Sequence, residues 1–174
     1  AKVIDDVEGM ADCGLRFAEP EIDLAALRAW KERIVHKLTD GLATLAKQRN
    51  VDIVRGTGSF LSPHHLEVID GEQRTVIAFR QCIIAAGSEC VRLPGFPEDP
   101  RIIDSTGALD LLSVPTTMLV VGGGIIGLEM ASVYSALGTK ISVVELTDSL
   151  MPGCDPDLVR PLQRRIAKRY AQIM

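Results

Sequence analysis

Residues 118–127 read Met118-Leu119-Val120-Val121-Gly122-Gly123-Gly124-Ile125-Ile126-Gly127, and this stretch indicates the fold of the chain most clearly. The four apolar residues are typical of a short parallel strand that is buried on both faces. The glycines fit the spacing G-x-G-x-x-G at Gly122, Gly124 and Gly127. In this motif the first glycine permits a sharp turn, the second lets a pyrophosphate approach the backbone, and the third lets helix and strand pack closely. The stretch therefore predicts a dinucleotide-binding βαβ unit. Its candidate contact residues are Gly122, Gly123, Gly124, Ile125, Ile126 and Gly127.

The residues that follow complete this unit and indicate which nucleotide it takes. A helix is expected to run to Leu137, where Gly138 ends it, and residues 140–144 are expected to form the second strand. Glu145 ends that strand, close to the spacing of about 20 residues at which an acid accepts hydrogen bonds from the adenosine ribose. A carboxylate would repel a 2′-phosphate, and residues 146–152 contain no Arg or Lys to neutralise one. These features predict NAD rather than NADP.

Beyond Glu145, the chain offers one more helix and the start of a further strand. Asp155 and Pro156 are typical of a helix start, whereas Pro161 conflicts with a regular helix because it removes one ladder hydrogen bond. Residues 171–174 resemble the beginning of a strand. The chain opens without Met, inside an expected helix over residues 1–13, and leaves no room for a third element to complete the sheet. We therefore expect a fragment of a longer protein.

The first half of the chain predicts a long helix followed by short strands. Asp23 can cap the helix, which should run to about Gln48 and bury one apolar stripe. That stripe consists of Leu24, Leu27, Trp30, Ile34, Leu38, Leu42 and Leu45. Strands are expected at 51–54, 66–68, 75–79 and 82–85, with turns at 55–58, 62–65 and Asp70-Gly71. The strands predict a β-meander against a buried strand. The Pro-rich stretch from Val91 to Pro100 predicts a connector.

Composition and charge narrow the classes of function. The net charge of −4 and the pI of about 5.4 argue against a nucleic-acid partner, and the longest apolar run is too short for a membrane span. The four cysteines form neither a C-x-x-C pair nor a regular framework, which favours a reducing cytoplasm. The three histidines have no further ligands at metal-binding spacing, so no metal site is expected.

With these motifs placed, the sequence resembles the flavin-dependent pyridine nucleotide–disulfide oxidoreductases, and among them the dihydrolipoamide dehydrogenases. The resemblance covers essentially the whole chain. It is carried above all by residues 121–130 together with Val143-Val144-Glu145. Further matching segments are 23–41, 56–60, 83–88 and 99–105.

The resemblance implies an α/β fold with part of an FAD-binding domain, made of long helices and a β-meander, before the first half of a Rossmann-type NAD-binding domain. The expected boundaries are 1–92 for the FAD part, 93–114 for the connector and 115–174 for the NAD part. By the same resemblance Gly58 would contact FAD near its adenylate half, and Ala86, Gly87 and Ser88 would lie along the same cofactor. Glu129 would lie near the nicotinamide.

The reaction of this family implies partners for the protein, and it also requires a redox cysteine pair that this chain does not contain. Electrons pass from a dihydrolipoyl group on an acyltransferase of a 2-oxo acid dehydrogenase complex, through a redox disulfide and FAD, to NAD in a homodimer. Cys82 and Cys90 do not match the family's C-x-x-x-x-C, so no catalytic residue is expected within this chain. Two alternatives stay open: another NAD(P)H-linked disulfide or metal reductase of the same family, and a non-catalytic NAD-binding module.

Overall fold

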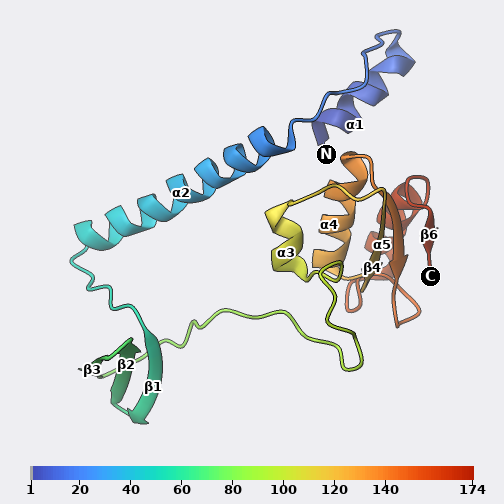
Figure 1. Ribbon diagram of the computed structural model, residues 1–174. Helices are drawn as coiled ribbons and strands as arrows, with labels where there is room; N and C mark the ends of the chain where they lie inside the picture. Colours follow the sequence, from blue (N-terminus) through green and yellow to red (C-terminus); the bar gives the residue numbers. More distant parts are fainter. Residues whose placement is uncertain (1) are drawn as a thin grey trace. The chain divides into compact units, whose positions relative to one another are not determined.

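The computed structural model describes residues 2–174, which form two compact units. One unit contains the residues up to Ala29 together with Cys90–Met174, and the other is Trp30–Glu89. The long helix α2 (Leu24–Gln48) begins in the first unit and continues into the second (Figure 1). Each unit is described by itself.

The first unit contains a parallel sheet of three strands in the order β4-β5-β6. Strand β4 (Thr117–Val121) pairs with β5 (Lys140–Val144), which pairs in turn with β6 (Gln172–Ile173). Helix α4 (Ile125–Ala136) connects β4 to β5, and α5 (Pro156–Ile166) connects β5 to β6. The predicted βαβ unit is therefore confirmed. The start of a strand expected at residues 171–174 is confirmed too, since Gln172 and Ile173 form β6 and pair with β5. This pairing also shows that the sheet has room for part of a third strand, which was not expected.

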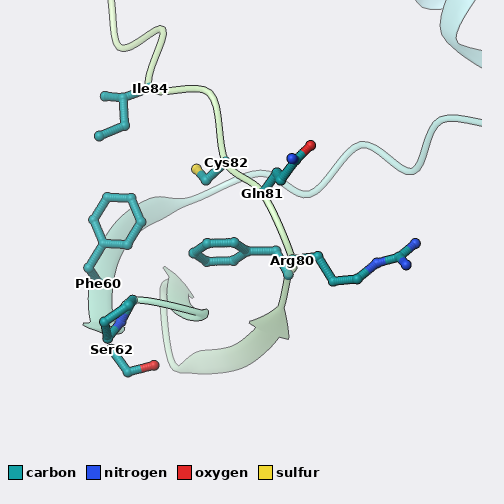
Figure 2. A pocket seen from close by; sticks show the side chains of 8 residues that line it. Phe60, Ser62, Arg80, Gln81, Cys82 and Ile84 are labelled. Atoms are coloured by element: carbon teal, nitrogen blue, oxygen red, sulfur yellow. The ribbon is translucent and has the colours of Figure 1, made fainter.

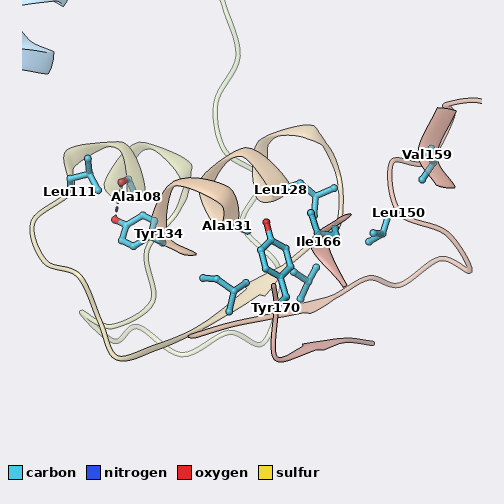
Figure 3. Packing of buried hydrophobic residues seen from close by; sticks show 11 residues of the cluster. Ala108, Leu111, Leu128, Ala131, Tyr134, Leu150, Val159, Ile166 and Tyr170 are labelled. Carbon is cyan, nitrogen blue, oxygen red and sulfur yellow. Dashed lines mark hydrogen bonds between the residues drawn. The ribbon is translucent and has the colours of Figure 1, made fainter. Parts of the chain in front are cut away.

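The core of this unit lies between α4 and the sheet, where small and branched side chains allow close packing (Figure 3). Ala131 of α4 and Val143 of β5 have no exposed surface, and Tyr134 is almost as deeply buried. The buried Tyr134 hydroxyl donates to the carbonyl of Ala108 at 2.9 Å, which satisfies its polar end and joins α4 to α3 (Ser105–Asp110). The other buried members are Leu111, Leu128, Ile141, Leu150, Val159, Ile166 and Tyr170.

The N-terminal helix α1 (Lys2–Gly9) is held to the end of α5 and the segment after it by charge. One carboxylate oxygen of Asp5 accepts from Arg165 at 3.0 Å, and the other accepts from Arg169 at 2.6 Å. Partial burial would raise the pKa of Asp5, but the hydrogen bonds and charges of the two arginines together bring it below its usual value. A short 3₁₀ turn, η1 (Met10–Cys13), follows α1. The predicted helix over 1–13 is confirmed from Lys2 onward, and Ala1 lies outside the described residues.

The second unit contains an antiparallel meander in the order β1-β2-β3. Its strands are β1 (Thr57–Ser62), β2 (His65–Asp70) and β3 (Gln73–Ala78). Asp70 pairs with Gln73, so Gly71 and Glu72 form a two-residue hairpin loop in which Gly71 has φ +58°. This confirms the turn expected at Asp70-Gly71, since a left-handed conformation suits glycine there.

Three expectations for the first half were wrong, and a fourth was wrong in part. Residues 51–54 and 82–85 are irregular instead of strands, and β1 begins inside the expected turn at 55–58. A short apolar run forms a strand only where another strand pairs with it, and in the described chain residues 51–54 and 82–85 are not paired. Ile83 is accordingly 91% exposed. Most of the apolar stripe of α2 is exposed as well, whereas Leu24 and Leu27 are half-buried and Leu24 packs against the core of the first unit. The exposed members are Trp30, Ile34, Leu38, Leu42 and Leu45. The α/β class itself and the long helix are confirmed, and Asp23 Oδ1 accepts from the Ala26 N–H at 2.9 Å as a cap.

Candidate functional site

The candidate site is the glycine-rich turn between β4 and α4. Gly122 has φ +105°, a conformation that side chains rarely adopt, and its N–H donates to the Val144 carbonyl at 2.8 Å. Gly124 is the N-cap of α4, with extended backbone and no side chain to occupy the free N–H groups of the first turn. The turn therefore points the positive end of α4 at open space beside the ends of two parallel strands. Such a helix end is suited to bind a phosphate group.

The glycines of this turn differ in what an added methyl group would meet. At Gly124, as at Gly122, a Cβ would meet no atom within 4 Å. At Gly127 it would overlap the carbonyl oxygen of Gly122, and it would lie 3.2 Å from Cγ1 of Val120. Gly127 therefore lets α4 lie close to β4, whereas the space over Gly124 is free for a ligand. This matches the separate roles that the motif assigns to its second and third glycines.

Glu145 follows β5 and reaches back to the glycine turn. Its Oε2 accepts from the Gly123 N–H at 2.7 Å, and its Oε1 accepts from both the N–H and the hydroxyl of Thr147 at 2.9 Å. The N–H of Thr147, then that of Gly123, and then the Thr147 hydroxyl lower the pKa of Glu145 below its ordinary value. The acid is thus ionised and held beside the turn, where it can accept hydrogen bonds from a ribose.

The loop after Glu145 also contacts the glycine turn. The N–H of Met151 donates to the Gly123 carbonyl at 2.9 Å, and Met151 has φ +54°, which is uncommon for a residue with a side chain. The buried side chain of Leu150 lies so close to Gly123 that a Cβ there would overlap it. Sequence reasoning missed Thr147, Leu150 and Met151. The only signal for them was their place next to Glu145, because their contacts depend on the loop conformation.

The remaining predicted residues of the first unit lie on the exposed side of α4. Ile125 and Ile126 occupy its first turn and are each 60% exposed. Glu129 is also exposed, one turn further along. The proposed contact between Glu129 and a nicotinamide stays a prediction.

The residues expected to contact FAD lie in the second unit, far apart in its chain. Gly58 lies in β1 opposite Val68, and an added Cβ would be in ordinary contact with Leu66. Ala86, Gly87 and Ser88 are exposed and irregular, with φ +78° at Gly87. Within the described residues these segments do not by themselves form a cofactor site. Their contact with FAD stays a prediction that rests on the family.

A shallow hollow in the second unit contains none of the predicted site residues (Figure 2). It is lined by Phe60, Ser62, Pro63, Phe79, Arg80, Gln81, Cys82 and Ile84. Within residues 2–174 no helix is both long and apolar enough to cross a bilayer, and no cluster of three or more His, Cys, Asp or Glu side chains is arranged to hold a metal. Cys13, Cys82, Cys90 and Cys154 are free thiols.

A parallel sheet with a glycine turn at its carboxyl edge and an acid at the end of the second strand defines the first half of a dinucleotide-binding domain. The sequence pattern of the pyridine nucleotide-disulphide oxidoreductases matches residues 4–173, and the chain belongs to this family. The family resemblance expected from the sequence is therefore confirmed.

Known relatives support the same assignment. The dihydrolipoyl dehydrogenase of Vibrio cholerae is 48% identical over 171 residues, which are 98% of this chain and 36% of that protein. The dihydrolipoyl dehydrogenase of Geobacillus stearothermophilus is 34% identical over 163 residues, or 94% of this chain and 35% of that protein. The chain thus spans about a third of the length of these relatives.

Solved structures share the fold. The LpdA protein of Mycobacterium tuberculosis matches with a TM-score of 0.85 at 20% identity, over 99% of this chain and 39% of that one. A HOCl-induced flavoprotein disulfide reductase of Escherichia coli, solved as a Cu(II) complex, matches with a TM-score of 0.77 at 25% identity. That match covers 99% of this chain and 37% of the reductase.

Proposed function

We propose that the glycine turn of this chain binds NAD. The observation that carries the proposal is the free space over Gly124 at the N-terminus of α4, with the Glu145 carboxylate held beside it. The helix N-terminus attracts the pyrophosphate, the absence of a Gly124 side chain lets it approach, and Glu145 accepts hydrogen bonds from the adenosine ribose. Because residues 146–152 offer no cation, a 2′-phosphate would be repelled.

We further propose that the chain serves a dihydrolipoyl dehydrogenase that also uses FAD. The relatives that bear this name, and the family to which the chain belongs, support this. FAD and the nicotinamide would supply the electron transfer, while the protein binds and orients them. The redox disulfide would come from outside this chain, since its own cysteines do not form the required pair. The substrate would be a lipoyl-bearing acyltransferase of a 2-oxo acid dehydrogenase complex.

The same proposal covers the oligomeric state, the cellular location and the partners of that enzyme. Its homodimeric state is supported only by the family resemblance. Its cytoplasmic location is supported by four thiols without disulfides, which suit a reducing compartment. The acidic net charge supports the absence of a nucleic-acid partner.

The test uses the native protein that contains this chain. We expect a yellow protein that reduces NAD⁺ with dihydrolipoamide and discriminates strongly against NADP⁺. The variant Glu145→Ala should weaken NADH binding by about ten- to a hundredfold, since a charge-assisted hydrogen bond contributes about 1.5–3 kcal/mol. The matched variant Asp148→Ala removes an exposed acid from the same loop and should bind NADH like the wild type. A colourless protein, or one that binds NADPH as well as NADH, would contradict the proposal.

The second candidate is a disulfide or metal reductase of the same family. It is favoured by the match to the E. coli flavoprotein disulfide reductase that was solved as a Cu(II) complex. Assays of the native protein with NADH and either Cu(II) or a low-molecular-weight disulfide would distinguish the two candidates. Turnover with these substrates but none with dihydrolipoamide would favour the second candidate.

A further inference from the structure

The Thr147 hydroxyl lies between two acceptors. It is 2.9 Å from Oε1 of Glu145 and 2.9 Å from the carbonyl oxygen of Ser149. A hydroxyl group has a single proton, so it can donate a full hydrogen bond to only one of them at a time. The charged carboxylate is the stronger acceptor, and the Ser149 carbonyl is an alternative within the same loop.

The number of hydrogen bonds that the Glu145 carboxylate can accept decides what the Thr147 hydroxyl must do when a ribose binds. A carboxylate has about four lone-pair sites, two on each oxygen. In the structure Oε1 accepts from the N–H and the hydroxyl of Thr147 and Oε2 accepts from the Gly123 N–H, while the Leu146 N–H stabilises the carboxylate least. One site is therefore open on Oε2, and a second opens on Oε1 if the Thr147 hydroxyl turns to Ser149. A ribose offers two neighbouring hydroxyl donors, which would use both sites.

We propose that the Thr147 hydroxyl competes with the adenosine ribose for Glu145: it donates to the Glu145 carboxylate before the ribose binds, and to the Ser149 carbonyl once the ribose hydroxyls bind Glu145. This inference rests on the proposed NAD site. The turn of one hydroxyl needs no movement of the backbone, because both acceptors are already at hydrogen-bond distance. The backbone N–H of Thr147 stays on Oε1 throughout and keeps the carboxylate in place.

Two variants of the native protein separate the hydroxyl from the rest of the side chain. Thr147→Val keeps the shape and the backbone N–H but removes the hydroxyl. It should lower the dissociation constant of NADH, by up to about tenfold, because the ribose no longer has to displace a hydrogen bond from the charged carboxylate to a weaker acceptor. It should lower the KM for NAD⁺ to a similar extent and leave kcat at saturating nucleotide unchanged. Thr147→Ser restores the hydroxyl and should bind NADH within about twofold of the wild type.

A modified nucleotide tests the link to the ribose. We expect NADH that lacks the adenosine 2′-hydroxyl to bind the wild type more weakly than NADH, and the effect of Thr147→Val to shrink with this analogue, because coupled groups are not additive. Fluorescence titration gives the dissociation constants without turnover. Comparing the two nucleotides in the wild type also tests the inference if Thr147→Val does not fold.

The possible outcomes distinguish a failure of this inference from a failure of the proposed NAD site on which it rests. If the wild type does not bind NADH at all, the proposed nucleotide site itself fails. If NADH binds but Thr147→Val binds it equally well or more weakly, or Thr147→Ser binds it as tightly as Thr147→Val, only the role of Thr147 is overturned. Equal binding of NADH and its 2′-deoxy analogue by the wild type would also overturn that role.

Discussion

Gly127 lies where α4 packs tightly against the end of β4 and against Gly122, the residue that follows β4. In the variant Gly127→Ala, the new methyl group would overlap the Gly122 carbonyl oxygen, so the helix would have to move away from the strand. Overpacking of this kind costs about 1–3 kcal/mol. We expect the free energy of unfolding of the native protein to fall by about this amount, as measured by urea denaturation.

Gly124 supplies the matched control for that substitution. Its backbone is extended and its added methyl group would meet only open space, so Gly124→Ala should leave stability within about 0.5 kcal/mol of the wild type. The same methyl group would occupy the approach of the pyrophosphate and should weaken NADH binding by about tenfold or more. Loss of stability in Gly124→Ala, or unchanged stability in Gly127→Ala, would contradict these separate roles.

The lowered pKa of Glu145 makes a prediction about pH. The Thr147 N–H, the Gly123 N–H and the Thr147 hydroxyl stabilise the carboxylate only in the folded protein. Its contribution to stability is therefore complete above the ordinary pKa of 4.5 and is lost as the pH falls through the lower folded value. The stability difference between wild type and Glu145→Gln should be constant from about pH 8 to about pH 5.5 and then shrink. Urea denaturation at several pH values measures it, and a difference that grows on acidification would contradict the assignment.

At the scale of elements, Pro161 stands inside α5 without breaking it. A proline at this position leaves the Asp157 carbonyl without its helical partner, because the ring has no N–H to donate. Pro161 is exposed, so Pro161→Ala removes no buried contact. We expect this variant to raise the free energy of unfolding by about 1 kcal/mol or more, with part of the gain from the restored bond offset by the entropy of the unfolded chain.

The measurement for Pro161→Ala is urea denaturation together with NADH titration. Leu158→Ala serves as a control in the same helix, because Leu158 is also exposed and its loss should change stability little. Binding of NADH should be the same in all three proteins, since α5 does not line the glycine turn. A destabilised Pro161→Ala variant would mean that the proline ring makes a contact that stabilises this helix.

The elements that could be predicted from the sequence are those whose signal is local. The β4–α4 turn and the hairpin at Gly71 follow from glycines that must adopt particular backbone conformations. Residues 51–54 and 82–85 looked equally like strands, but a strand forms only where a neighbour pairs with it. Glu145 was found because it ends a strand at a fixed spacing. The contacts of Thr147 and Met151 could not be found, because they depend on how an irregular loop folds back.

At the scale of the whole molecule, the apolar stripe of α2 exposes large side chains that a folded protein normally covers. Leu38 and Leu42 are 66% and 67% exposed in the described chain. A continuous apolar row of this kind marks a surface that packs against something else. The relatives are much longer than this chain, which covers about 36% of their length. We expect that in a protein of that length further segments cover the stripe.

If further segments cover the stripe, the same substitution should have different effects in the 174-residue chain by itself and in the native protein. In the 174-residue chain by itself, Leu38→Gln and Leu42→Gln should reduce self-association and leave the helix content unchanged, because they only alter exposed surface. In the native protein each should lower the free energy of unfolding by about 2–5 kcal/mol, the cost of losing a large apolar side chain from a core. Arg33→Gln, on the polar side of α2, should change neither property. Urea denaturation and sedimentation measure the two effects, and equal stability of the native protein with and without Leu38→Gln would show that the stripe is left uncovered.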